Sequence, residues 1–304
     1  MITETAFTNQ PLMGFINIDK PIDVTSHDCV AKVRRWAKMK RVGHGGTLDP
    51  AATGVLPLAV GKATRLLQFL PNGKAYQATI RLGWRTSSDD LEGEIIEQTS
   101  ASHLTLDQVK PHLQQFLGKI IQIPPVYSAI QKDGKRLYEL ARQGKSVDVP
   151  PREVEIDQIE ILNWQGGEFP ELTLEIRCKS GTYIRSIARD LGKAVGTGGT
   201  LSALRRTKSS GFSLEDSFTL PNLETELRDG KFTPLPLDYP LQHLERIDLD
   251  SNQARRWCQG QFVVLSTASD RPSFLRVYRE DGLFLGVGEK VPPEILKPKT
   301  VMEA

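Results

Sequence analysis

One carboxylate in this sequence stands alone among positive charges, in a segment that could carry chemistry. The stretch GHGGTLDPAATGVLPL, residues 43–58, places Asp49 in a glycine-rich turn that leads into an apolar run. Residues 29–88 contain eleven Lys or Arg residues, and Asp49 is their only Asp or Glu. Either a basic surface happens to carry one acid, or that surface brings an anionic partner to a reactive carboxylate. The charge imbalance weighs against a plain turn in which Asp49 caps local N–H groups.

The loop around Asp49 has the composition of a close-contact site. Its glycines permit positive φ angles and let the backbone approach a partner closely. Pro50 disfavours the helical region for Asp49 and stiffens the turn. The loop is not a phosphate-binding P-loop, because its glycine spacing differs and no GK[ST] closes it.

Three further side chains are candidates whose alternatives stay open. Arg185 falls in the first turn of a predicted helix, where the helix dipole disfavours a cation by about 0.3–1 kcal/mol. A specific anionic partner would explain this, and a solvated surface arginine is equally consistent. Tyr76 lies on the apolar face of a strand predicted at 74–85, where a tyrosine is usually a core residue. His44 has no second histidine at metal-ligand spacing, and such loop histidines are most often solvated.

The run LSALRRTKSSGF, residues 201–212, is basic, with Arg205, Arg206 and Lys208 close together. Such a run is normally a solvated face. Together with the basic residues of a helix predicted at 26–39, it could also form a stripe that contacts phosphates.

Bulk properties limit the classes of protein. The net charge of the 304-residue chain is only +2, so any nucleic-acid binding must come from local clustering. Three widely spaced cysteines argue against a disulfide framework or a zinc site. The N-terminus lacks a signal-peptide pattern, and no apolar stretch approaches the roughly 20 residues that span a bilayer. We expect a soluble, cytoplasmic protein.

Hydrophobic periodicity predicts a mixed α/β domain to about residue 230, followed by a small β-rich region. Strands are predicted at 14–21, 55–60, 74–85, 154–162 and 171–179. Helices are predicted at 26–39, 62–70, 105–117, 135–144 and within 180–196. The proline-rich segment 233–240 indicates a linker, and Asp-Gly at 281–282 indicates a hairpin.

Six segments follow one another along the chain: DKP (19–21), RVGHGGTLDPAATGVLPLAVGKATRL (41–66), KAYQATIRLG (74–83), IPPVYSAIQKDGKRLYELARQG (123–144), SGTYIRSIARDLG (180–192) and LRRTKSSGF (204–212). Together they resemble the TruB family, the bacterial tRNA pseudouridine-55 synthases. The match covers most of residues 14–212, too long and too well ordered to be chance. The C-terminal region more loosely resembles the small PUA-like RNA-binding domain of these enzymes.

The resemblance implies an α+β fold. Its core would be a mixed, largely antiparallel sheet of the pseudouridine synthase type with flanking helices. The implied parts are a catalytic domain at 1–232, a linker at 233–244 and a PUA-like domain at 245–304. An RNA-clamping insertion is expected at about 124–150, with the basic residues Lys132, Lys135, Arg136, Arg142 and Lys145.

The resemblance also implies a reaction. Such enzymes isomerise uridine 55 in the T-arm loop of tRNA by base flipping, with no cofactor, metal or guide RNA. The aspartate of their GTLDP motif matches Asp49, which would be the nucleophile at the base or at the sugar C1′. The implied partner is the T-arm stem-loop of tRNA, with no membrane and no obligate protein partner.

Matching positions imply roles for the other site residues. Arg185 would pair with Asp49, since a nearby cation favours the ionised carboxylate. Tyr76 would stack on the extruded uracil, and His44 would enter the vacated loop and help to hold the flipped state. Four more positions match residues that line the pocket in relatives: Lys20, Pro21, Tyr183 and Leu204.

Three other functions fit these residues less well. A non-catalytic RNA-binding protein of the same fold would not need a lone Asp49 amid positive charge. A hydrolase using Asp49 with His44 lacks a second well-placed acid and an evident oxyanion motif. A guide-RNA-dependent pseudouridine synthase of the archaeal and eukaryotic branch is the closer rival, and the segment 123–144 favours the stand-alone enzyme.

Overall fold

The computed structural model describes residues 12–127, 131–132, 135–136, 149–265, 273–292 and 294–303. These residues fall into two compact units. The first draws on 1–50, 55–71 and 210–304, and the second on 51–54 and 72–209. Residues 137–144 of the helix predicted at 135–144, and most of the predicted insertion at 124–150, lie outside the described residues. Lys135–Arg136, at the start of that predicted helix, form strand β9 instead.

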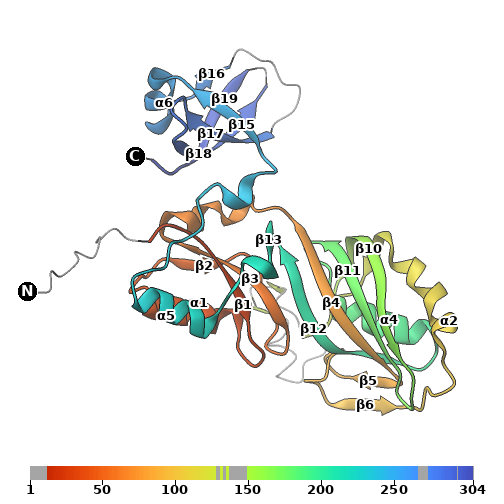
Figure 1. The fold of residues 1–304 in the computed structure, drawn as a ribbon. Coiled ribbons are helices and arrows are strands. Elements are labelled where there is room, and N and C mark those ends of the chain that lie inside the picture. The colour runs from red at the N-terminus through yellow and green to blue at the C-terminus, as the bar shows by residue number, and fades with distance from the viewer. Residues whose placement is uncertain are drawn as a thin grey trace, which may run out of the picture. The chain divides into compact units, whose positions relative to one another are not determined.

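The first unit begins with a small sheet that carries helices (Figure 1). Its elements, with η for a 3₁₀ helix, are β1 (Gly14–Lys20), α1 (Ser26–Trp36), β2 (Val42–His44), β3 (Thr53–Val60), η1 (Gly61–Phe69), β13 (Phe212–Ser213), η3 (Leu214–Asp216), β14 (Phe218–Thr219) and α5 (Leu220–Arg228). The strand order is β14–β1–β3, and β2 pairs with β3. Side chains such as Ile16 of β1, Val33 of α1 and Leu223 of α5 form one buried core, which holds both helices on the sheet.

The start of α1 differs from the sequence-based expectation and supports the loop of Asp49. The helix predicted from residue 26 is capped by Thr25, one residue earlier, which exchanges hydrogen bonds with Asp28 in a capping box. Ser26 is buried instead, where its hydroxyl donates to the Leu48 carbonyl at 3.1 Å and accepts from the Leu48 N–H at 2.8 Å. This two-way bond ties α1 to the residue before Asp49.

A five-stranded sheet completes the first unit. Its elements are η4 (Tyr239–Leu241), β15 (Glu245–Leu249), α6 (Ser251–Cys258), β16 (Val263–Val264), β17 (Ser273–Arg279), β18 (Phe284–Val291) and β19 (Ile295–Val301). The order is β15–β17–β18–β19–β16, with only the β15–β17 pair parallel. The predicted Asp-Gly turn at 281–282 joins β17 to β18 and is confirmed. Trp257 of α6 is fully buried in the core of this sheet.

The segment predicted to be a linker is packed within the first unit. Leu235 and Phe15 exchange backbone hydrogen bonds of 2.8 and 2.9 Å. The ring of Tyr239 lies 5.5 Å from that of Phe212, centroid to centroid. The bounds 233–244 for a linker between two domains stay a prediction.

The second unit is a broad antiparallel sheet with α4 against it (Figure 1). Its elements are β4 (Gly73–Leu82), β5 (Trp84–Thr86), β6 (Ile95–Gln98), α2 (Leu106–Val109), η2 (Lys110–Phe116), β7 (Gly118–Gln122), β8 (Gln131–Lys132), β9 (Lys135–Arg136), β10 (Arg152–Gln165), β11 (Glu171–Lys179), α4 (Ile184–Ala194) and β12 (Gly199–Ser209). The strand order is β12–β4–β11–β10–β7, and each neighbouring pair is antiparallel. β1 and β14 of the first unit pair in parallel, so the strands of the described residues form the expected mixed, largely antiparallel arrangement.

Most predicted elements are present, and two differ in detail. The predicted helix at 105–117 divides into α2 and η2, because Pro111 has no N–H for an α-helical hydrogen bond. The predicted helix at 62–70 is the 3₁₀ helix η1. The strand predicted at 74–85 breaks at Gly83, whose φ of +89° ends β4 before β5 begins.

All three cysteines, Cys29, Cys178 and Cys258, are free thiols. Burial raises the pKa of the Cys29 thiol and of the Cys178 thiol to about 11. No helix within the described part of the chain has the length and apolar character to cross a membrane.

Two glycines let α4 lie close against β12. A Cβ at Gly192 of α4 would fall 2.0 Å from the backbone nitrogen of Gly199. A Cβ at Gly199 would fall 2.4 Å from the carbonyl oxygen of Ala188. Because these neighbours are backbone atoms, they cannot move aside as a flexible side chain would. The close approach fixes the height of α4 above the sheet.

We therefore expect Gly192→Ala to lower the free energy of unfolding by about 1–3 kcal/mol, the usual cost of overpacking. This exceeds the gain of up to about 1 kcal/mol from helix propensity. Urea denaturation followed by circular dichroism measures it. Gly73→Ala is the control, because a Cβ there meets no atom within 4 Å. Equal stability of the two variants would show that α4 has room to move.

Candidate active site

The loop that carries Asp49 is braced from within the first unit. Asp49 is half-buried, one residue beyond the buried Leu48 that Ser26 holds. Nearer the start of the loop, the Gly45 N–H donates to the Pro57 carbonyl at 2.8 Å. Backbone atoms on both sides of the loop glycines are thus fixed, so the position of the carboxylate is set by the fold.

Lys20 is the strongest brace of this loop. Its side chain is fully buried at the end of β1, and its ammonium donates to the carbonyls of Pro21, Val24 and Pro50 at 2.8, 2.6 and 3.1 Å. Burying an ammonium is costly unless hydrogen bonds compensate it, and three carbonyls do so here. Lys20 therefore places a positive charge behind the Asp49–Pro50 peptide, while Pro21 itself is exposed.

His44 ends β2, where its backbone pairs with Leu58 of β3. The ring is half-buried, and the Gly46 N–H approaches its Nδ1 at 3.4 Å. His44 comes from the same loop as Asp49, as predicted.

Tyr76 lies on one face of β4 in the second unit. It is 6% exposed, and its strand partners are Ile176 of β11 and Arg206 of β12. Leu204 pairs with Ala78, two residues along on the same face. The structure therefore brings together Tyr76 and Leu204, two of the predicted site residues.

Two cations share this face with Tyr76. Arg206 is fully buried, so the idea that it joins a surface stripe contacting phosphates is wrong for this residue. The pairing of β12 with β4 places Arg206 opposite Tyr76, where it is buried. The sequence of the basic run alone did not show this burial. Lys74 precedes Tyr76 by two residues, and burial together with the charge of Arg206 lowers the pKa of its ammonium. A face with two desolvated cations is electrostatically suited to an anion.

Arg185 is the second residue of α4 and 7% exposed. Its guanidinium lies 3.2 Å from a carboxylate oxygen of Asp90 and donates to the carbonyls of Ser88 and Tyr127 at 3.2 and 2.9 Å. The expectation of an anionic partner, which would explain a cation placed against the helix dipole, is confirmed within this unit. The alternative of a solvated surface arginine is wrong, because the side chain is buried.

The first turn of α4 is held by a polar clamp. Tyr183 precedes the helix, and its N–H and carbonyl bond the Oε1 and Nε2 of Gln122 at 2.8 and 3.0 Å. Gln122 is itself buried at the end of β7. These two hydrogen bonds fix the position of the first turn of α4, and with it the position of Arg185.

Asp90 is the functional candidate that the sequence reasoning missed. Its carboxylate accepts a short hydrogen bond from the Ser88 hydroxyl and one of 3.1 Å from the Glu92 N–H. Its signal was present: Asp89 and Asp90 are the first acids after the acid-poor stretch 29–88. The long separation of Asp90 and Arg185 in the sequence hides their contact.

The predicted site residues thus form two groups. Asp49, His44, Lys20 and Pro21 belong to the first unit, and the others to the second. The ion pair between Asp49 and Arg185 stays a prediction. Among the described residues, no cluster of His, Cys, Asp or Glu is arranged to hold a metal ion.

Comparison with known proteins decides the family. Residues 34–184 match the N-terminal domain of TruB family pseudouridylate synthases, 185–247 a tRNA pseudouridylate synthase B C-terminal domain, and 246–302 the C-terminal domain of pseudouridine synthase II TruB. A Trichormus variabilis protein is 57% identical over 293 residues, 96% of this chain and 99% of that protein. A Gloeothece citriformis protein is 59% identical over 283 residues, 91% of each. Both are named tRNA pseudouridine synthase B. The chain belongs to the TruB family.

Solved structures agree with this TruB fold. A chain of a Cbf5–Nop10–Gar1 complex has a TM-score of 0.71 and 26% identity, covering 95% of this chain and 82% of that one. A chain from an H/ACA RNP bound to a substrate RNA containing 2′-deoxyuridine has a TM-score of 0.71 and 24% identity, covering 96% and 86%. The TruB fold of this chain thus extends over nearly its whole length.

Asp90→Asn tests the buried pair of this TruB protein. We expect it to lower the free energy of unfolding by about 3–5 kcal/mol, because it leaves Arg185 buried without a carboxylate. Glu97→Gln is the matched control: it breaks an ion pair with Arg85 whose side chains are about half exposed, and should cost less than about 1 kcal/mol. Guanidinium denaturation measures both. Equal costs would mean that the Asp90 pair contributes no more than a surface pair.

Proposed function

We propose that this chain isomerises uridine 55 in the T-arm loop of tRNA to pseudouridine, with Asp49 as nucleophile and without a guide RNA. The observation that carries the proposal is the 57% identity, over 96% of the chain, to a protein named tRNA pseudouridine synthase B. The lone acid in a basic segment supports an anionic substrate that must reach one carboxylate. RNA is such a substrate.

The chemistry is an internal rearrangement of one nucleotide. The N1–C1′ bond breaks, a C5–C1′ bond forms, C5 loses a proton and N1 gains one. No atom is gained or lost overall. Asp49 supplies the nucleophile, at C6 of the base or at C1′ of the sugar, so that a covalent adduct divides one difficult step into easier ones.

The carboxylate must stay ionised while enclosed. Desolvation disfavours the charged form and neighbouring cations favour it. The ammonium of Lys20 donates to the carbonyl of Pro50, the residue that follows Asp49, and so provides one such cation. Arg185 is the second in this proposal, and its guanidinium is already oriented by Asp90, Ser88 and Tyr127.

The target base must leave its stack, at a cost of a few kcal/mol. Tyr76 offers a nearly buried ring on which the extruded uracil stacks, and Leu204 on the same face contributes an apolar neighbour. His44, on the loop of Asp49, enters the space that the base vacates. Tyr76 also assists removal of the C5 proton.

The sequence identities to the two kinds of relative support independence from a guide RNA. The chain is 57% identical to a relative named as a tRNA enzyme and 26% identical to the chain of the Cbf5–Nop10–Gar1 complex. A protein that finds its target without a guide must recognise the RNA itself, by shape, backbone contacts and splayed-out bases.

Asp49→Asn tests the nucleophile. The variant should lose pseudouridine formation altogether, because an amide cannot form the adduct, and should retain most of its tRNA binding. Tritium release from 5-³H-uridine tRNA, with purified protein and nothing added, measures turnover and guide independence together. Asp23→Asn is the control: it makes the same change at an exposed acid whose N–H bonds the Pro50 carbonyl. Wild-type turnover in Asp49→Asn would overturn the assignment.

Arg185→Lys tests the planar cation. Turnover should fall by about tenfold or more, because a point charge does not reproduce the contacts of a guanidinium fork. Single-turnover kinetics with saturating enzyme separate this loss from weaker tRNA binding. Arg177→Lys on β11 is the control, since its ion pair with Glu175 is about half exposed on the arginine side. A near-normal rate in Arg185→Lys would count against its catalytic place.

A further inference from the structure

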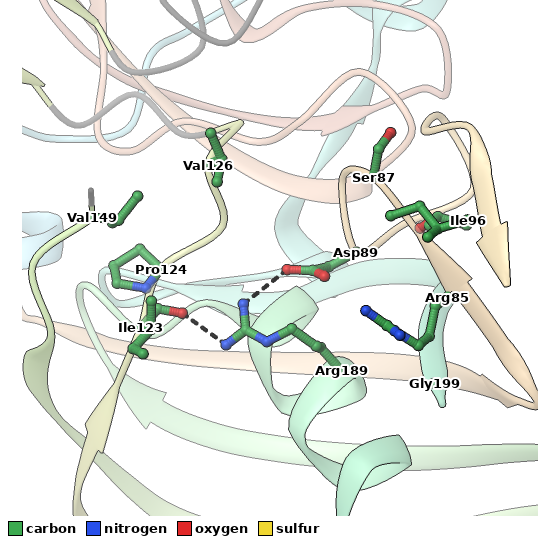
Figure 2. Close-up of a pocket in the computed structure, with 11 residues that line it drawn as sticks. Arg85, Ser87, Asp89, Ile96, Ile123, Pro124, Val126, Val149, Arg189 and Gly199 are labelled. Atoms are coloured by element: carbon green, nitrogen blue, oxygen red, sulfur yellow. Dashed lines mark hydrogen bonds and ion pairs between the residues drawn. The ribbon is translucent and has the colours of Figure 1, made fainter. Parts of the chain in front are cut away.

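A second concave site lies in the second unit, apart from the residues of the proposed reaction. It is a cavity of about 370 Å³, within the range of small-ligand pockets. Figure 2 shows Arg189 between Asp89 and Ile123, and Arg85 entering from the side opposite Ile123 and Pro124. Its lining residues are Arg85, Thr86, Ser87, Asp89, Ile96, Ile123, Pro124, Val126, Val149, Arg189 and Gly199. None of them is among the site residues named above.

The floor of this pocket is polar and already ordered. Arg189 of α4 pairs with Asp89 at 3.0 Å and donates to the Ile123 carbonyl at 2.9 Å (Figure 2). It also pairs with Asp190 at 2.9 Å. Burial raises the pKa of the Asp89 carboxyl, and the charge of Arg189 opposes that shift. Asp89 therefore presents a partly desolvated acceptor beside a fixed guanidinium.

The walls of the pocket are apolar and open to solvent. Ile96 is 60% exposed, Ile123 54% and Val126 36%. Arg85 stands at the same rim with its side chain 55% exposed, paired to Glu97 at 2.7 Å. Large apolar side chains gathered around a charged hollow indicate a ligand with a flat apolar part and a polar, anionic part.

We propose that this pocket binds one ribonucleotide, with the base against Ile96, Ile123 and Val126 and the phosphate at Arg85. Bases stack on apolar and aromatic walls and on guanidinium planes, and they offer N–H groups to an acceptor such as Asp89. The proposal rests on the proposed function, in which the nucleotide belongs to the bound RNA but is not the target uridine.

The placement of the pocket fits a nucleotide near the target. Arg185 and Arg189 stand four residues apart on α4, about 6 Å along the helix axis. They pair with Asp90 and Asp89, which are adjacent in the chain. The pocket is thus built on the same helix and the same turn as the Arg185 site, so one RNA strand can reach both.

An abasic scan combined with a filled pocket tests the proposal. A T-arm hairpin is made with one abasic nucleotide at a time, outside the target position, and its binding is measured with the wild-type chain and with Val126→Trp, which fills the pocket. In the wild type, one abasic position should weaken binding about tenfold or more, the loss expected for one stacked base. In Val126→Trp, whose pocket is filled, the same abasic nucleotide should not weaken RNA binding any further.

Two controls keep the test interpretable. Ile121→Trp adds the same side chain at a neighbouring residue of β7 that is 68% exposed and does not line the pocket. It should leave the abasic profile as in the wild type. Arg85→Gln removes the phosphate contact without filling the pocket, and should weaken binding of intact hairpin while sparing the stacking effect.

Nucleoside monophosphates distinguish the source of the ligand. If AMP, GMP, CMP or UMP binds the wild type but not Val126→Trp, and the abasic effects are unchanged in the variant, the pocket takes a free nucleotide. If abasic effects persist in Val126→Trp and no monophosphate binds, the proposal is wrong. Tritium release from wild-type protein is measured in parallel, so that failure of the proposed function is seen separately.

Discussion

The arrangement of the second unit of this TruB protein depends on one buried guanidinium, that of Arg185. Arg185 is 7% exposed, and a desolvated cation is tolerated only with a carboxylate and further acceptors around it. Asp90 and the carbonyls of Ser88 and Tyr127 meet that need. The turn that carries Asp90 and the helix that carries Arg185 are therefore held in one arrangement, and the close approach of α4 to β12 keeps the helix at the required height.

The first unit also buries a cation, and backbone carbonyls compensate its loss of solvation. Lys20 is fully buried and satisfied by three carbonyls, one of them that of Pro50. Its charge adds positive potential beside the loop of Asp49. Buried cations in both units thus favour an ionised acid and an anionic partner.

The periodic parts of the chain were predictable, and the residues with long-range partners were not. Alternation along β4 placed Tyr76 on the apolar face, and the spacing of Ile184, Ile187 and Leu191 predicted α4. Arg206 looked like a surface residue, because strand register and the bulge in β12 determine its burial. Asp90 escaped notice because 95 residues of sequence separate it from Arg185.

By itself, the sequence carried the resemblance to the family in six collinear segments. It also determined the lone Asp49 in its stiffened loop and most of the strands and helices, because these depend on local residue types and short-range periodicity. Only the tertiary structure decided that Lys20 supports the loop from behind, that Asp90 neutralises Arg185, and that Asp89, Arg189 and an apolar wall enclose a second pocket. The reason is physical. Burial and ion pairing depend on which distant segments the sheet brings within a few ångströms, and neither composition nor spacing encodes that distance.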